Sequence, residues 1–296
     1  MFRHCISALV TPFKNGELDI DALSALVEWQ IQAGIGGLVA CGTTGESAAL
    51  SEAEHCQIVE QIIRATRGRV PILAGAGAAD TRKSIRLARH AKQVGAHGIL
   101  VVTPYYNRPS AAGLEAHYGA IADAVEIPLI LYNVPGRTGV DLTLTTIAKL
   151  AKHPNIMGIK DASADLSRVS PMRAECGPEF RLISGDDHSA LGYIAHGGEG
   201  VISVTSNVAP HEMSRMIGLA IQGDFAAARS ANDRLAPLHK ALFADASPAP
   251  AKYALAQMGH LRDELRLPLV QARQEARQQV DAALQFLAPG SAAGAS

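Results

Sequence analysis

The most constraining feature of the sequence is a set of short aliphatic runs that recur roughly every 20 to 30 residues. Amphipathic stretches with helical periodicity lie between them, among them 21–33, 52–67, 81–94 and 113–125. Runs that are apolar throughout are typical of parallel strands that are buried on both faces. We therefore predict strands at 6–10, 37–40, 70–74, 98–102, 129–132, 156–160, 181–184 and 200–204.

Eight strand-and-helix units indicate either a closed (β/α)8 TIM barrel or an open doubly wound sheet. The barrel is favoured because the chain has eight units and lacks the glycine fingerprint of a dinucleotide-binding sheet. From about residue 210 onward the pattern is helical only. We expect an α/β barrel over residues 1–222, a C-terminal helical region over 223–288 and a disordered, low-complexity tail over 289–296.

The charge balance argues against several classes of partner. The 296 residues carry 28 acidic and 27 basic side chains, so we expect neither nucleic acid nor a membrane surface as a partner. No apolar run approaches the roughly 20 residues of a membrane span, and the N-terminal stretch does not resemble a signal peptide. Four scattered cysteines fit reduced thiols. We expect a soluble, cytoplasmic globular protein.

In a TIM barrel the catalytic groups come from the carboxyl ends of several strands. The residues after the predicted strands supply hydroxyl groups, one amine and one guanidinium, whereas histidine is nearly absent. The main candidates are Thr11, Thr43, Thr44, Tyr105, Tyr106, Tyr132, Arg137, Lys160, Gly185 and residues 203–207.

Lys160 is the most informative of these residues because it alone among the eight lysines ends an aliphatic strand. The other seven, Lys252 included, lie in predicted turns or on readable helix faces. One interpretation is that Lys160 reaches out of the barrel mouth to a carboxylate such as that of Asp161. The other is a buried amine that its surroundings keep uncharged and that forms a Schiff base. The residues alone leave both open.

The neighbouring candidates also allow two interpretations each. Tyr132 and Tyr106 are either packing rings or proton carriers for imine chemistry. Thr43 and Thr44, in the Gly-rich turn GTTGE, either extend a hydroxyl chain or bind an anion. Arg137 is either a solvated side chain or a fork that captures a carboxylate.

Motifs of several other reaction classes are missing. The sequence has no GxxxxGK phosphate loop, no GxSxG elbow and no HExxH zinc motif. Asp186, Asp187 and His188 are adjacent and cannot all face one ion from a strand end, so we expect no catalytic metal.

Five segments together resemble the pyruvate-dependent class I aldolase superfamily, which includes dihydrodipicolinate synthase and N-acetylneuraminate lyase. They are GTTGES at 42–47, TPYYN at 103–107, YNVPGRTG at 132–139, GIKD at 158–161 and GVISVTSN at 200–207. The likeness extends from about residue 6 to residue 287. Arg-Thr-Gly at 137–139 indicates the synthase branch, whose members condense pyruvate with L-aspartate 4-semialdehyde on the diaminopimelate route to lysine. The resemblance thus implies a lyase that needs no cofactor.

The resemblance also implies roles for individual residues. Lys160 would form the imine with pyruvate, and Tyr132 would donate and accept protons. Thr43 and Tyr106 would complete the relay, with Tyr106 reaching in from a neighbouring subunit. A homo-oligomer, usually a dimer of dimers, follows from that arrangement.

The substrate-binding residues are implied in the same way. Thr44 and the backbone at Ile202 would hold the pyruvate carboxylate. Arg137 would hold the carboxylate of the semialdehyde, and Gly185 would belong to the substrate-binding set.

Two other functions compete with this one. A related enzyme would keep the pyruvate imine but accept a sugar or a hydroxy-oxoacid as the aldehyde. A catalytically silent barrel, used for ligand sensing or assembly, would form no covalent adduct with pyruvate. A further departure from the family pattern is Ser247, where an asparagine is common, and we expect it to lie outside the site.

Lysine feedback is expected to be weak or absent. Many family members bind lysine at a subunit interface through residues that match Ser47, Ala48, Glu52, His55, Ala79, Lys83 and Tyr105. Regulated members carry histidine, asparagine and glutamate at the positions of Glu52, Ala79 and Lys83, and Lys83 opposes a cationic ligand with a like charge. A steady-state assay with added lysine tests this, and half-inhibition at sub-millimolar lysine contradicts it.

Overall fold

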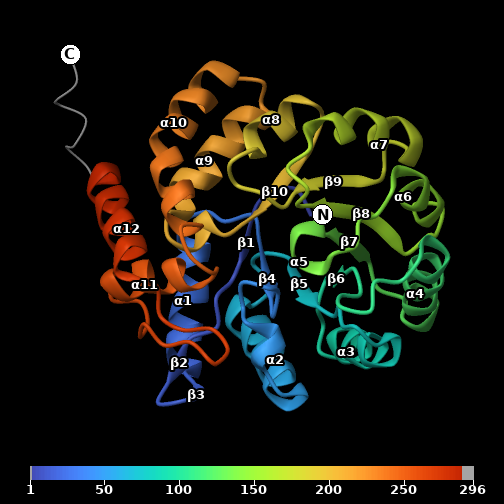
Figure 1. Ribbon diagram of the computed structural model, residues 1–296, viewed down its shortest axis with the longest axis horizontal. Helices are drawn as coiled ribbons and strands as arrows, with labels where there is room; N and C mark the ends of the chain where they lie inside the picture. The colour runs from blue at the N-terminus through green and yellow to red at the C-terminus, as the bar shows by residue number, and fades with distance from the viewer. Residues whose placement is uncertain (1, 289–296) are drawn as a thin grey trace.

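The computed structural model describes residues 2–288 and has the predicted barrel. Eight parallel strands close in the order β1-β10-β9-β8-β7-β6-β5-β4 (Figure 1). They are β1 (His4–Ala8), β4 (Gly37–Ala40), β5 (Ile72–Gly75), β6 (Gly98–Val102), β7 (Leu129–Asn133), β8 (Ile156–Asp161), β9 (Arg181–Ser184) and β10 (Gly200–Ser203). All eight predicted strands are confirmed, with ends that differ by two residues at most. The tail expected at 289–296 lies outside the described residues.

A ring of helices covers the outside of the barrel, one or two after each strand (Figure 1). They are α1 (Ile20–Gln32), α2 (Glu52–Thr66), α3 (Thr81–Gln93), α4 (Ala111–Ala124), α5 (Pro135–Thr138), α6 (Leu144–Leu150), α7 (Val169–Cys176), α8 (Ala190–Ala195) and α9 (Pro210–Ile221). Ser51 and Glu54 form a reciprocal capping box at the start of α2. Asp80 caps α3 by accepting two backbone N–H bonds. Both caps are readable from the sequence.

Short elements complete the barrel. Three 3-10 turns, η1 (Ser47–Ala49), η2 (Leu166–Arg168) and η3 (Thr205–Asn207), follow β4, β8 and β10. After β1 a two-stranded hairpin, β2 (Phe13–Lys14) and β3 (Glu17–Leu18), was not predicted, although Asn-Gly at its turn is a strong hairpin signal.

The barrel interior is an aliphatic core that ends at the carboxyl ends of the strands. Alternate strand residues point inward and form one cluster: Phe2, Ile6, Ala8, Val39, Leu73, Leu100, Ile130, Tyr132, Val134, Ile183 and Ile202. The next residues along each strand pack outward against the helices. Polar side chains on inward positions therefore lie at the mouth of an otherwise apolar barrel.

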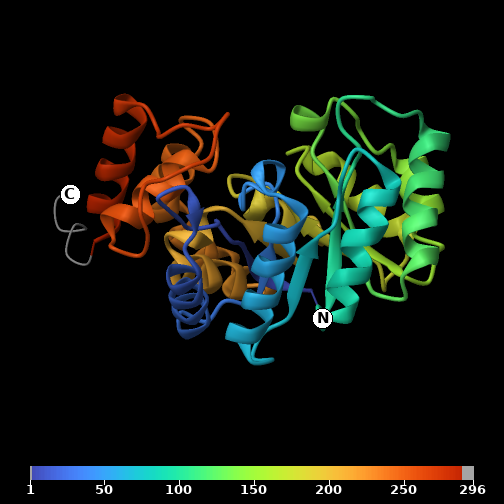
Figure 2. The ribbon, with the colours of Figure 1, turned by 90° about the horizontal axis from the view of Figure 1, so that it is seen from below.

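Three more helices, α10 (Phe225–Leu242), α11 (Ala249–Gln257) and α12 (Gln274–Leu287), follow the barrel. They lie together on one side of it, and α10 packs against α9 and α12 (Figure 2). The segment between α11 and α12 turns back toward the barrel, and Arg266 in it contacts Glu54 of α2. Within residues 2–288 no helix has the length and apolarity to cross a membrane.

Candidate active site

Lys160 and Tyr132 lie side by side at the barrel mouth. They are paired residues on the neighbouring strands β8 and β7, so both side chains point inward. The Lys160 side chain is buried, with the residue only 5% exposed, and its Nζ lies 4.2 Å from the centre of the Tyr132 ring. A charged amine over an aromatic face gains a cation–π attraction.

The Lys160 side chain is buried and does not reach out of the barrel mouth to a carboxylate, which is against the first of its two interpretations. Among residues 2–288 no carboxylate lies within ion-pair distance of its Nζ. Asp161, the next residue, points outward because side chains alternate along a strand. Gly185, after β9, leaves the room that Lys160 occupies: a Cβ there would lie 3.0 Å from Lys160 Cε and 2.7 Å from Ala162 Cβ.

Asp161 instead belongs to a polar network behind the site. Its carboxylate accepts bonds from the Asn133 side chain at 3.1 Å and from Arg168 Nε at 3.2 Å. Asn133 and Arg168 also bond to Asp141, at 2.8 and 3.0 Å. The network ties the ends of β7 and β8 together, and these ends carry Tyr132 and Lys160.

The turn at 42–46, after β4, carries the two candidate threonines. Thr44 is buried and Thr43 is half-buried, and the turn is tight because the backbone N–H groups of Gly45 and Glu46 each donate to the carbonyl three residues earlier. Glu46 ends the turn in the left-handed conformation, with φ of 55°. Thr43 lines the cavity at the mouth.

Ile202 lies on β10, buried, and faces inward with Tyr132. The backbone just after it is fixed by the buried carboxylate of Asp187, which accepts bonds from the N–H groups of Val204 and Thr205, both at 2.9 Å. The β10 end is therefore a rigid stretch of backbone close to the interior core.

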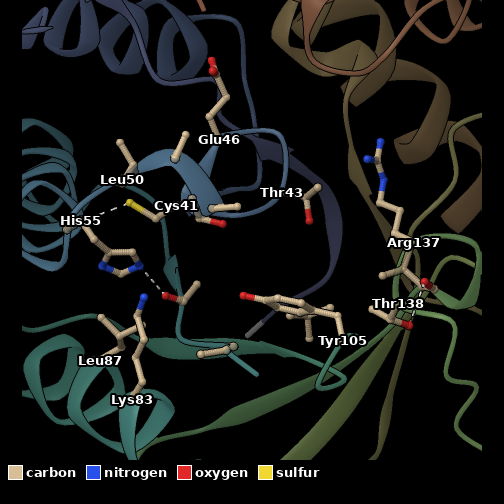
Figure 3. Close-up of a pocket in the computed structure, with 18 of the residues that line it drawn as sticks. Cys41, Thr43, Glu46, Leu50, His55, Lys83, Leu87, Tyr105, Arg137 and Thr138 are labelled. Carbon is tan, nitrogen blue, oxygen red and sulfur yellow. Dashed lines mark hydrogen bonds between the residues drawn. The ribbon is translucent and has the colours of Figure 1, made fainter. Parts of the chain in front are cut away.

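Arg137 and Tyr106 differ from the other candidates because both are exposed. Arg137 lies on the short helix α5, directly after β7, and its guanidinium points away from Tyr105 (Figure 3). Tyr106 is 95% exposed and has a left-handed backbone, with φ of 71°. The structure therefore does not bring Tyr106 to Lys160 within one chain.

A cavity of about 380 Å³ opens beside the barrel mouth (Figure 3). Thr43, Arg137 and Thr138 line one part of it. Its lining also includes all but Ala79 of the seven residues that the resemblance related to lysine binding: Ser47, Ala48, Glu52, His55, Lys83 and Tyr105. Lys160 and Tyr132 lie outside its walls.

The charges of this cavity differ from those of an amine-binding site. Glu52 forms a fork with Arg86, both contacts at 3.1 Å, which uses its carboxylate. Lys83 has no ion-pair partner within the described part of the chain. Burial lowers the pKa of His55, whose Nε2 lies 2.7 Å from the Gly75 carbonyl oxygen. The cavity thus presents two cations, Lys83 and Arg137, that have no ion-pair partner among the described residues, and a His55 imidazole whose pKa is lowered.

Two residues of the C-terminal region have contacts that the sequence did not indicate. Lys252, expected in a turn or on a readable helix face, lies on α11 but is fully buried and pairs with Glu46 at 2.7 Å. Ser247, expected outside the site, is buried and lines the cavity that Thr43 and Arg137 also line, whereas Lys160 and Tyr132 do not. Both belong to the C-terminal helical part, whose faces look ordinary when each helix is considered alone.

The family model described as dihydrodipicolinate synthetase family matches residues 1–287. The chain belongs to this family. A 4-hydroxy-tetrahydrodipicolinate synthase of Phenylobacterium zucineum is 55% identical over 284 residues, which make up 96% of this chain and 97% of that protein.

Two solved structures of dihydrodipicolinate synthases superpose on nearly the whole chain. The chloride-inhibited enzyme of Acinetobacter baumannii, complexed with pyruvate, has a TM-score of 0.95 and 46% identity and covers 97% of this chain and 99% of its own. The enzyme of Cyanidioschyzon merolae, with lysine bound, has a TM-score of 0.94 and 38% identity and covers 96% of this chain and 98% of its own.

The close approach of Gly185 to Lys160 allows a test in this member of the dihydrodipicolinate synthetase family. Gly185→Ala should lower the rate of borohydride trapping of Lys160 with pyruvate about tenfold or more, because the added methyl group pushes the amine from its position. Gly218→Ala, in α9 with open space around its Cβ position, is the control and should leave the rate unchanged. An unchanged rate in Gly185→Ala, with the fold intact by circular dichroism, contradicts the prediction.

Proposed function

We propose that the chain is a 4-hydroxy-tetrahydrodipicolinate synthase that condenses pyruvate with L-aspartate 4-semialdehyde through an imine on Lys160. The single observation that carries the proposal is the placement of the Lys160 amine. It lies buried at the mouth of an apolar barrel, over the Tyr132 ring and unpaired with any carboxylate of residues 2–288. An amine without a paired carboxylate is free to act as a nucleophile.

The chemistry follows from that nucleophile. The amine adds to the ketone carbon of pyruvate, and loss of water gives a protonated imine that acts as an electron sink. The methyl group then loses a proton to give an enamine, whose carbon attacks the aldehyde. The amino group of the bound semialdehyde finally attacks the imine carbon, closes the ring and releases Lys160.

Protons must enter and leave at each of these steps. Tyr132 is the donor and acceptor in our proposal, because its ring lies directly against the amine. Thr43 and Tyr106 complete the relay, with Tyr106 supplied by a second copy of the chain. Its 95% exposure and left-handed backbone support that placement, since an exposed aromatic ring held in a strained conformation fits a surface that a partner covers.

The assembly is therefore a homo-oligomer in this proposal, built as a dimer of dimers. Sedimentation velocity at assay concentrations measures this directly, and a monomer alone would exclude the shared tyrosine. We also place the enzyme in the cytoplasm, because Cys5, Cys41, Cys56 and Cys176 all carry free thiols, which fits a reducing compartment.

The two carboxylates of the substrates need separate positions. Thr44 and the backbone at Ile202 hold that of pyruvate, since both are buried and Ile202 faces the same interior as Tyr132. Arg137 holds that of the semialdehyde from the exposed rim, where its guanidinium fork has no ion-pair partner among the described residues. Gly185 keeps the space beside the amine open.

The proposed imine can be trapped chemically. Borohydride reduction of the wild type with pyruvate should add the mass of one reduced pyruvate to each chain, and peptide mapping should place it on Lys160. Lys160→Ala should lose both the adduct and turnover, whereas Lys152→Ala, which changes an exposed lysine, should keep both. An unmodified wild type would indicate the catalytically silent barrel instead.

Arg137 separates the synthase from the related aldolases. Arg137→Ala should raise KM for the semialdehyde about 10- to 100-fold, because a hydrogen bond to a charged group contributes about 1.5–3 kcal/mol. Pyruvate trapping should be unchanged, and Arg89→Ala, an exposed arginine on α3, serves as the control. If semialdehyde turnover survives Arg137→Ala intact, the assignment to the synthase branch fails.

A further inference from the structure

A lysine of the C-terminal helices forms a buried ion pair with the turn that follows β4. Lys252 of α11 places its Nζ 2.7 Å from Oε1 of Glu46, and both side chains are completely buried (0% exposed). The same Nζ donates to the carbonyl oxygen of Thr11 at 2.8 Å and lies 4.3 Å from the centre of the Phe13 ring. The ammonium thus touches the loops that follow both β1 and β4.

The Glu46 carboxylate is held from a second direction as well. Its Oε2 accepts a bond from the backbone N–H of Arg266, in the segment after α11, at 3.1 Å. In Figure 3 the carboxylate points away from His55, Lys83 and Tyr105. Both of its oxygen atoms are bonded by the C-terminal part of the chain.

These contacts hold the 42–46 turn at two positions: at Glu46 and, through Thr11, at the Gly45 carbonyl. Glu46 ends the turn in a left-handed conformation, which a side chain with a Cβ adopts only when its surroundings hold it there. Thr11, whose carbonyl binds Lys252, donates its own hydroxyl to the Gly45 carbonyl oxygen at 2.7 Å. Lys252 therefore bonds the turn through Glu46 on one side and through Thr11 on the other.

A role in stability alone explains this pair poorly. Replacing a buried ion pair by apolar side chains of similar volume is often neutral or stabilising, because the desolvation of two charges offsets their attraction. Burial accordingly lowers the pKa of Lys252, and Glu46 opposes that shift. The pair instead fixes the relative position of the two side chains, because a buried charge is satisfied in only a few positions of its partner.

We infer that Lys252 is a positioning residue, which holds Thr43 and Thr44 in place through Glu46 and Thr11. The inference rests on the proposed function of those two threonines. It also makes α11 part of the working active site, although α11 contributes no group that touches substrate. Displacement of the turn would move Thr44 from the pyruvate carboxylate and Thr43 from the relay, while Lys160 and Tyr132 stay on their strands.

The test compares Lys252→Met with Tyr253→Phe. Tyr253 is the next residue on α11, and its hydroxyl bonds Asp281 of α12 at 3.1 Å, so Tyr253→Phe loosens the same helix without touching the turn. Lys252→Met should raise KM for pyruvate and lower kcat, each at least fivefold, while saturating pyruvate still gives the Lys160 adduct. Tyr253→Phe should stay within twofold of the wild type in both constants. A folded Lys252→Met with both constants within twofold of the wild type overturns the inference.

A double-mutant cycle between Lys252 and the two threonines of the turn separates positioning from general destabilisation. In a Thr43→Val/Thr44→Val background, Lys252→Met should cost less than twofold further in kcat/KM, because its effect passes through these threonines. A full multiplicative loss in that background overturns the inference.

The double variant Glu46→Gln/Lys252→Met covers the case in which Lys252→Met alone does not fold, because it leaves no uncompensated buried charge. It should be folded by circular dichroism and still lose at least tenfold in kcat/KM, and wild-type activity in it overturns the inference. Failure of the proposed function is seen separately, as absence of the pyruvate adduct in the wild-type enzyme.

Discussion

Closure of eight parallel strands into a barrel decides where a reactive side chain can lie. Once the sheet is closed, every second residue of each strand faces a core filled by aliphatic side chains, and the core is open to solvent only at its ends. Lys160 occupies the last inward position of β8, so its stem packs in the core while its amine lies at the mouth. That position buries the side chain and still leaves its amine at the open end of the core.

The alternation of side chains along a strand also separates the candidate site residues from the residues that support them. Lys160 and Tyr132 face inward, and the residues that follow them, Asp161 and Asn133, face outward into the network with Arg168. A pair of neighbouring residues on each strand thus supplies one inward candidate site residue and one outward residue of the supporting network. The network has a buried carboxylate and a guanidinium in mutual contact, which holds the two strand ends in fixed register.

Much of this arrangement could be predicted from the sequence because it depends on local patterns. Uniformly apolar runs locate the strands, and a lysine at the end of such a run stands out against lysines on helices. The burial of Lys252, by contrast, could not be predicted from a local pattern. Its helix carries polar and apolar residues in an ordinary order, and its burial results from the packing of α11 against loops more than 200 residues earlier in the chain. Glu46 carries no local signal for its contact with Lys252, and Ser247 carries none for its place at the cavity wall.

The helices beyond the barrel are therefore more than an addition to a finished fold. The 42–46 turn ends in a buried carboxylate, and the barrel strands offer that carboxylate no counter-charge; Lys252 and the Arg266 backbone supply its partners. A barrel that folded without α11 would have to expose Glu46 to water or rearrange the turn, since an unpaired buried charge is strongly unfavourable. The same helices bring Ser247 to the cavity wall. The geometry of the barrel mouth is thus shared between its own loops and a region that contributes no strand to the barrel.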